Sequence, residues 1–181
     1  MQEDVLRLLR FFRFQAYYGR VAPDEETLDT CARLAPKLSG LSGERVAREV
    51  FLLLDAPRPT DMFRLMAQHR ILNHILPSLV RFDWLDALMS LDSAPVSRIL
   101  RLAALLEGGA SAAEKAARRL RLSNEEHESL RALAAPSVHL HPGLETHQRR
   151  RYLYRLGAER YRELALIAWA GASINSLEKS E

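Results

Sequence analysis

Apolar residues recur with the three- and four-residue spacing of an α-helix along almost the whole of this 181-residue chain. Proline, glycine and short polar stretches interrupt the pattern at short intervals. No stretch shows the alternation of a half-buried strand, and there is no internal repeat or low-complexity linker. The sequence therefore predicts an all-α fold, an array of short antiparallel helices joined by short connections.

Capping and breaking residues divide this pattern into separate helices. The expected helices cover about 3–18, 22–38, 42–54, 60–72, 83–91, 95–106, 111–120, 123–133, 144–156 and 158–174. Capping boxes are predicted at Ser111 with Glu114 and at Ser123 with Glu126. We divide the chain into a first helical layer, 1–80, and a second helical region, 81–181.

The composition is ordinary for a globular protein, with 48% hydrophobic and 27% charged residues. Cys31 is the single cysteine, so no internal disulfide is available and a reducing compartment is expected. The first residues do not have the pattern of a signal peptide. The most apolar stretch, 164–174, is too short to span a bilayer as a helix. We therefore expect a cytoplasmic protein with no membrane partner.

The net charge is only +3, but arginine supplies nearly all of the positive charge. Of the 26 basic residues, only Lys37, Lys115 and Lys179 are lysines. Arginine binds phosphates and base edges in a planar, bidentate geometry, so this bias is compatible with a nucleic-acid partner. A bias in genomic base composition would produce the same excess.

The first expected helix opens with an acidic pair followed by arginines at intervals of three: Glu3, Asp4, Arg7, Arg10 and Arg13. Asp4 and Arg7 share a helix face, where a carboxylate and a guanidinium present an acceptor beside a donor. Cytosine and adenine offer the complementary order on their Watson–Crick edges. Uracil and guanine offer the reverse order, which would leave buried polar groups unpaired at a cost of about 1–3 kcal/mol each. The alternative is ordinary pairing of surface charges.

Other arginines are candidates for contact with an RNA backbone. Arg10 and Arg13 could reach phosphates or could lie on the solvated side of the helix. Two later patches also suit a backbone: Arg118, Arg119 and Arg121, and Arg149, Arg150, Arg151, Tyr152, Tyr154 and Arg155. Tyrosines interleave the second patch, as expected where stacking adds to phosphate contact. A solvated helix face explains either patch equally simply.

Four segments resemble, in order, the helical part of class II tRNA nucleotidyltransferases and bacterial poly(A) polymerases. The opening EDVLRLLRFFRF resembles the family's Glu-Asp-x-x-Arg neck motif and the run that follows it. The later segments are LSGERVAREVFLLL, with Ser42, Glu44, Arg45 and Glu49 in place, PTDMFRLMAQHRILNHILPSL and RLRLSNEEHESL. The resemblance implies that Asp4 and Arg7 select the incoming nucleotide, with Glu3 and Arg10 beside them, and that the later helices grip RNA.

The family's catalytic residues have no counterpart in this sequence. Nucleotidyl transfer needs metal-binding carboxylates, which the family carries as an Asp-x-Asp in a head domain after a Gly-rich loop. The nearest pattern here is Asp83-x-x-Asp86 on an expected helix. We therefore expect Mg²⁺ only in a head domain upstream, and no catalysis by this chain alone. His139, His141 and His147 lack further ligands at metal-site spacing, so no metal is expected there.

The sequence thus predicts the RNA- and nucleotide-recognising part of an enzyme that extends RNA 3′ ends. The resemblance implies ATP and CTP as substrates and tRNA or another RNA 3′ end as partner. It does not separate CCA addition from poly(A) addition, and it leaves the oligomeric state open. The alternative is a free-standing helical module that binds RNA or a protein without any catalysis.

Overall fold

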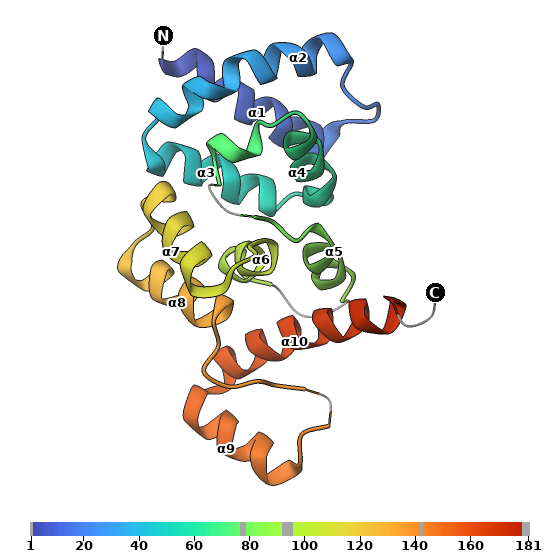
Figure 1. The fold of residues 1–181 in the computed structure, drawn as a ribbon, viewed down its shortest axis with the longest axis vertical. Helices are drawn as coiled ribbons and strands as arrows, with labels where there is room; N and C mark the ends of the chain where they lie inside the picture. Colours follow the sequence, from blue (N-terminus) through green and yellow to red (C-terminus); the bar gives the residue numbers. More distant parts are fainter. Residues whose placement is uncertain (1, 77–78, 92–95, 142, 179–181) are drawn as a thin grey trace.

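The computed structural model of the chain describes residues 2–76, 79–91, 96–141 and 143–178, with the side chains of 2–4 and 175–178 outside that description. Within these residues it contains ten α-helices, two short 3-10 helices and no strand, so the predicted all-α fold is confirmed (Figure 1). None of the described helices is long and apolar enough to cross a membrane.

The helices follow one another through short connections, close to the predicted ranges. In chain order they are α1 (Gln2–Tyr18), α2 (Glu25–Leu34), η1 (Ala35–Gly40), α3 (Gly43–Leu54), α4 (Pro59–Gln68), η2 (Leu72–His74), α5 (Phe82–Ser90), α6 (Arg98–Leu105), α7 (Gly109–Leu120), α8 (Asn124–Ala134), α9 (Thr146–Leu156) and α10 (Ala158–Glu178). The helices from α1 to η2 lie at the top of Figure 1, and we call them the upper layer. Helices α5 to α8 lie below this layer, and α10 and α9 form the lower end.

Helix α1 is held against α3 and α4 by its apolar face. Leu9, Phe12 and Ala16 repeat at intervals of three and four and are all buried, with Phe12 inaccessible to solvent. This spacing places them on one side of the helix, because an α-helix turns once in 3.6 residues. The arginines between them therefore lie toward the flanks and the outer side of α1.

The upper and lower segments of the chain pack directly on each other through α3 against α6 and α7, and through α4 against α5. Gly43, at the start of α3, has no side chain to separate it from the end of α7: a Cβ there would lie 2.6 Å from the carbonyl oxygen of Arg119. The buried side chains of both segments belong to one continuous core. The division at residue 80 stays a prediction, and it does not divide the hydrophobic core.

One of the two predicted capping boxes is confirmed. The Ser123 hydroxyl accepts the Glu126 backbone N–H, and the Glu126 carboxylate accepts the Ser123 N–H. The box at Ser111 is wrong, because α7 already begins at Gly109. Gly108 and Gly109 both adopt positive φ, 107° and 59°, which lets the chain turn into the helix two residues early.

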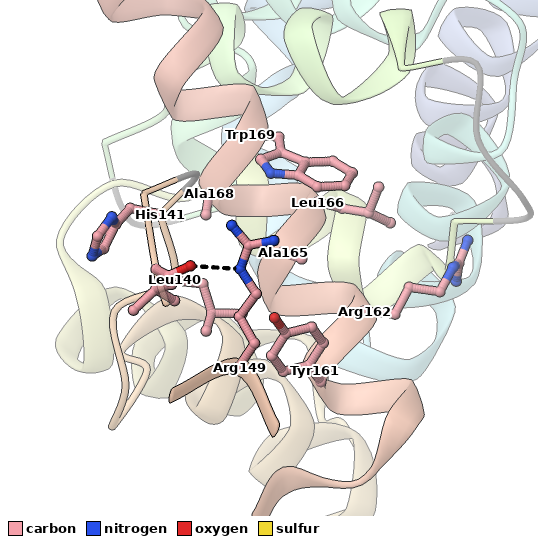
Figure 2. A pocket seen from close by; sticks show the side chains of 10 residues that line it. Leu140, His141, Arg149, Tyr161, Arg162, Ala165, Leu166, Ala168 and Trp169 are labelled. Atoms are coloured by element: carbon pink, nitrogen blue, oxygen red, sulfur yellow. Dashed lines mark hydrogen bonds between the residues drawn. The ribbon is translucent and has the colours of Figure 1, made fainter. Parts of the chain in front are cut away.

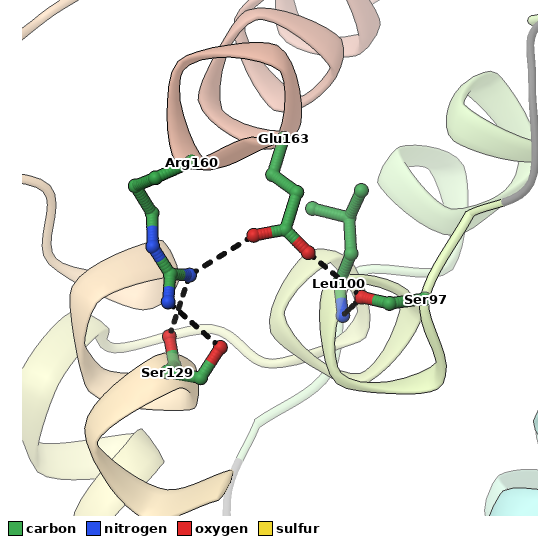
Figure 3. A network of polar contacts seen from close by, with 5 residues as sticks. All are labelled: Ser97, Leu100, Ser129, Arg160 and Glu163. Carbon is green, nitrogen blue, oxygen red and sulfur yellow. Dashed lines mark hydrogen bonds and ion pairs between the residues drawn. The ribbon is translucent and has the colours of Figure 1, made fainter. Parts of the chain in front are cut away.

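Polar side chains fasten the first turns of α10 to two other helices (Figure 3). The buried Glu163 carboxylate accepts hydrogen bonds from the Ser97 hydroxyl at 2.9 Å and from Arg160 Nη1 at 3.1 Å. Arg160 Nη2 donates to the Ser129 hydroxyl at 3.0 Å. Since Ser97 caps α6 and Ser129 lies on α8, this network sets the position of α10.

The middle of α10 lies very close to α5. A Cβ on Gly171 would lie 2.6 Å from Cη2 of Trp84, closer than real Cβ atoms approach other atoms. Glycine therefore permits this contact. The position of α9 depends mainly on its contact with α10.

Candidate nucleic-acid interface

Two of the α1 arginines converge on one buried carboxylate of α3. Arg10 Nε lies 3.5 Å from Glu49 Oε1, and Arg13 Nη1 lies 3.3 Å from Glu49 Oε2. The Glu49 side chain is only 5% exposed, whereas those of Arg10 and Arg13 are 43% and 19% exposed. We call these three residues the Glu49 brace. The brace holds α1 against α3 by ion pairing, and it leaves the two guanidinium groups partly exposed to solvent. The sequence did not predict this role for Glu49.

Of the proposed nucleotide-binding residues, Glu3, Asp4 and Arg7 lie one and two turns before this brace, and Arg10 belongs to it. Arg7 is exposed on α1. The backbone of Glu3 and Asp4 is helical, and their side chains lie outside the described residues. The selection of the nucleotide by Asp4 and Arg7, with Glu3 and Arg10 beside them, therefore stays a prediction.

The C-terminal half of α1 also presents aromatic rings to solvent, which the sequence reasoning did not single out as a surface. Phe14, Tyr17 and Tyr18 are all exposed, and the Phe14 and Tyr18 rings stack with centroids 6.2 Å apart. The Arg13 guanidinium lies 4.8 Å from the centre of the Phe14 ring. The signal in the sequence was FQAYYG, where aromatic residues fall on the side of α1 that carries its polar residues.

Two arginines of α7, Arg118 and Arg119, make different kinds of contact. Arg118 Nε donates to Glu114 Oε1 at 2.7 Å, and this hydrogen bond lowers the pKa of the Glu114 carboxyl. Arg119 is half-buried and donates to the carbonyl oxygens of Leu38 and His74, at 2.8 and 3.4 Å. Arg119 thus connects α7 to both 3-10 helices. Contact of Arg118 and Arg119 with RNA stays a prediction.

Helix α9 carries the most open basic surface. It has no buried residue and no acidic residue between Thr146 and Leu156. Arg150, Arg151 and Arg155 are exposed, and the Arg151 guanidinium lies 5.6 Å from the centre of the half-buried Tyr152 ring. We call Arg150, Arg151 and Arg155 the α9 arginines. Because these side chains are exposed, they can bind a phosphate backbone without breaking a contact that stabilises the fold.

The ends of α9 are defined by its own residues. Glu145 and Gln148 form a capping box at the first turn, and Gly157 follows the last turn with a φ of 78°. Arg149 differs from the other basic residues of the helix, since its Nε donates to the Leu144 carbonyl at 2.8 Å. This bond turns Arg149 toward α10.

Figure 1 places α1 and α9 at opposite ends of the long axis of the molecule, with α7 between them. The predicted nucleotide-binding and RNA-binding residues therefore do not form one compact patch. They are spaced along an elongated protein, an arrangement that suits a long ligand better than a small one.

The two acidic side chains closest to a catalytic pattern contact an arginine in the structure. Asp83 and Asp86, the nearest pattern to a catalytic acidic pair, both accept hydrogen bonds from Arg64 Nη2, at 2.8 and 2.7 Å. Elsewhere, one surface group in the described part of the chain brings metal-ligand atoms within 4.8 Å of one another, at Glu25, Asp29 and His69. That group lies on α2 and at the end of α4, apart from the predicted site residues.

Known proteins are similar to part of this chain, which includes most of the upper layer. Residues 21–82 match the family model described as "Probable RNA and SrmB- binding site of polymerase A". The chain is 38% identical over 80 residues to mouse CCA tRNA nucleotidyltransferase 1, mitochondrial, covering 41% of this chain and 18% of the relative. It is 35% identical over 79 residues to the Bordetella pertussis CCA-adding enzyme, covering 42% and 22%.

A poly(A)-adding relative matches as well. The chain is 30% identical over 82 residues to poly(A) polymerase I of Escherichia coli O6:H1, covering 45% of this chain and 17% of the relative. The matched segments thus span about a fifth of the length of these relatives.

The predicted resemblance is confirmed: the matched segments are similar to CCA-adding and poly(A)-adding enzymes. Residues 21–82 are an RNA-binding region of that type, and they comprise α2, η1, α3, α4, η2 and the first residue of α5. Helix α1 begins before this segment, and α9 begins 64 residues after its end.

Proposed function

We propose that this chain is the RNA-holding region of an enzyme that adds nucleotides to RNA 3′ ends, either CCA to tRNA or a poly(A) tract. The observation that carries the proposal is the match of residues 21–82 to the RNA-binding region of the family. The exposed α9 arginines support it, because they extend the positive surface to the far end of the molecule. RNA backbones are held chiefly by such contacts to phosphates.

Within this proposal, α1 selects the nucleotide. Asp4 accepts the exocyclic amino group of cytosine or adenine, and Arg7 donates to the neighbouring ring nitrogen. The Glu49 brace supports this assignment, since it holds α1 against α3 two turns away and so limits the motion of the selecting face. The substrates are then ATP and CTP.

The reaction itself also requires a nucleotidyl-transferring domain. Its carboxylates would hold Mg²⁺, which neutralises the triphosphate and activates the primer hydroxyl. Residues of the present chain contribute binding and selection. Cytoplasmic location belongs to the same proposal and is supported by the single cysteine, Cys31, which is free.

The proposal is tested by measuring the affinity of the chain for tRNA by filter binding over a series of salt concentrations. We expect the logarithm of the binding constant to fall linearly with the logarithm of salt, with a slope of about −3 for three or four phosphate contacts. The slope arises because each neutralised phosphate releases condensed cations. No detectable binding at about 50 mM salt, where such contacts are strong, would contradict the proposal.

Nucleotide selection is tested separately, in the protein together with its nucleotidyl-transferring domain. We expect Asp4→Ala to reduce the preference for CTP and ATP over UTP and GTP by about 10- to 100-fold, because the unpaired polar group that penalised the wrong bases is removed. The measurement is incorporation of each nucleotide in competition. Asp29→Ala, which removes an exposed carboxylate of α2, is the control. Unchanged preference in Asp4→Ala would exclude Asp4 from selection.

A further inference from the structure

A pocket of about 460 Å³ lies between α10 and the segment that leads into α9 (Figure 2). Its volume is within the range of pockets that enclose small molecules or parts of larger ligands. The pocket is lined by Leu140, His141, Leu144, Arg149, Tyr161, Arg162, Ala165, Leu166, Ala168 and Trp169. None of these residues belongs to the segment matched by the family model.

One wall of the pocket is aromatic and open. Trp169 is 51% exposed, although tryptophan is usually largely buried. Tyr161 lies two turns earlier on α10 and lines the same pocket. The small side chains of Ala165 and Ala168 leave space beside the indole ring. A flat ligand could therefore lie against the exposed part of the Trp169 ring.

The opposite wall is cationic. The Nε of Arg149 donates to the Leu144 carbonyl at 2.8 Å, and Figure 2 shows the guanidinium directed across the pocket toward α10. His141 also lines the pocket, as does Arg162 from α10 itself, and no acidic residue is among the lining residues. This combination favours a ligand with an aromatic ring and a negative charge close to it.

We propose that this pocket holds one unpaired nucleobase of single-stranded RNA, stacked on Trp169, with the adjoining phosphate near Arg149. The inference rests on the proposed function, since it assumes that the chain binds RNA. Charge complementarity selects this occupant: the α9 arginines lie on the helix that contains Arg149 and carry the positive surface beyond the pocket. A base inside a duplex is not available for such stacking, whereas an unstacked base in a loop or at an end is.

The test compares a fluorescently labelled 12-nucleotide single strand with a duplex of the same sequence, both bound to the full chain. We expect Trp169→Ala to weaken binding of the single strand by about 10-fold, the range for loss of one base–aromatic stack, and to leave duplex binding within about twofold. Trp169→Phe keeps a ring at the same position and should retain most of the affinity. Ala165→Phe fills the pocket while Trp169 stays in place, and should weaken the single strand alone.

The outcomes separate this inference from the proposed function. If Trp169→Ala and Ala165→Phe bind both RNAs as the unaltered chain does, the pocket is not a base site, while RNA binding by the chain stands. If the variants lose affinity for strand and duplex equally, with unchanged thermal unfolding, stacking of an unpaired base is also excluded. If the unaltered chain binds neither RNA at low salt, the proposed function itself fails.

Discussion

Replacing Arg10 and Arg13 together by alanine is expected to lower the free energy of unfolding by about 3 kcal/mol, the lower end of the cost of leaving a buried charge without its partner. The reason is the burial of Glu49, whose side chain is 5% exposed and faces both guanidinium groups at 3.3–3.5 Å. In the double variant the carboxylate remains in the interface of α1 and α3 without a cation. Urea unfolding followed by circular dichroism measures the loss.

The control for this prediction is a triple variant that adds Glu49→Gln to the two alanines. Because glutamine is neutral and of similar shape, it should recover part of the lost stability if the penalty comes from the buried charge. A double variant that unfolds within about 0.5 kcal/mol of the unaltered chain, the usual range for exposed surface substitutions, would contradict the brace. Arg10 and Arg13 would then be open surface arginines, as the simpler interpretation of the sequence had them.

Reversing the charge of all three α9 arginines, with Arg150→Glu, Arg151→Glu and Arg155→Glu, is expected to weaken RNA binding by about 100-fold at low salt. Each lost phosphate contact should also reduce the salt slope by about 0.7 to 0.9. Stability should change little, because no residue of α9 is buried and these side chains are exposed. Filter binding over a salt series measures affinity and slope together.

Lysine at the same three positions is the matched control. It preserves the charge while removing the planar fork, so the salt slope should be retained and the affinity should fall by less than about tenfold. If the glutamate variant binds RNA as tightly as the unaltered chain, α9 is a solvated face. The RNA-holding surface would then be confined to the upper layer, where the family match lies.

Much of the helix pattern could be predicted from the sequence because it depends on neighbours three and four residues apart. The run from Glu145 to Leu156 and the box at Ser123 are local patterns, and both appear as expected. The capping box predicted at Ser111 is wrong because of the local backbone conformation before it. Gly108 and Gly109 reach backbone angles that other residues avoid, and the start of α7 moves two residues earlier.

The candidate site was less predictable, because arginines that look alike in sequence have different surroundings in the fold. Arg119 and Arg150 were both assigned to RNA. Arg119 is half-buried and donates to carbonyl oxygens 81 and 45 residues earlier in the chain, whereas Arg150 is exposed on α9. No spacing rule connects Arg119 to Leu38 or His74, since that contact depends on how three helical elements pack.

The sequence by itself determined the all-α class, most helix boundaries and the family resemblance, because periodicity, caps and ordered motifs are local properties of the chain. Tertiary structure alone decided which charged side chains pair with each other and which aromatic rings remain exposed to solvent. Glu49 meets Arg10 and Arg13 because α3 packs across α1. Trp169 borders a pocket because α10 packs on α5 and its first turns bond to Ser97 of the α6 cap and Ser129 of α8. Such contacts join residues far apart in the chain, so their energies enter only once the helices have packed.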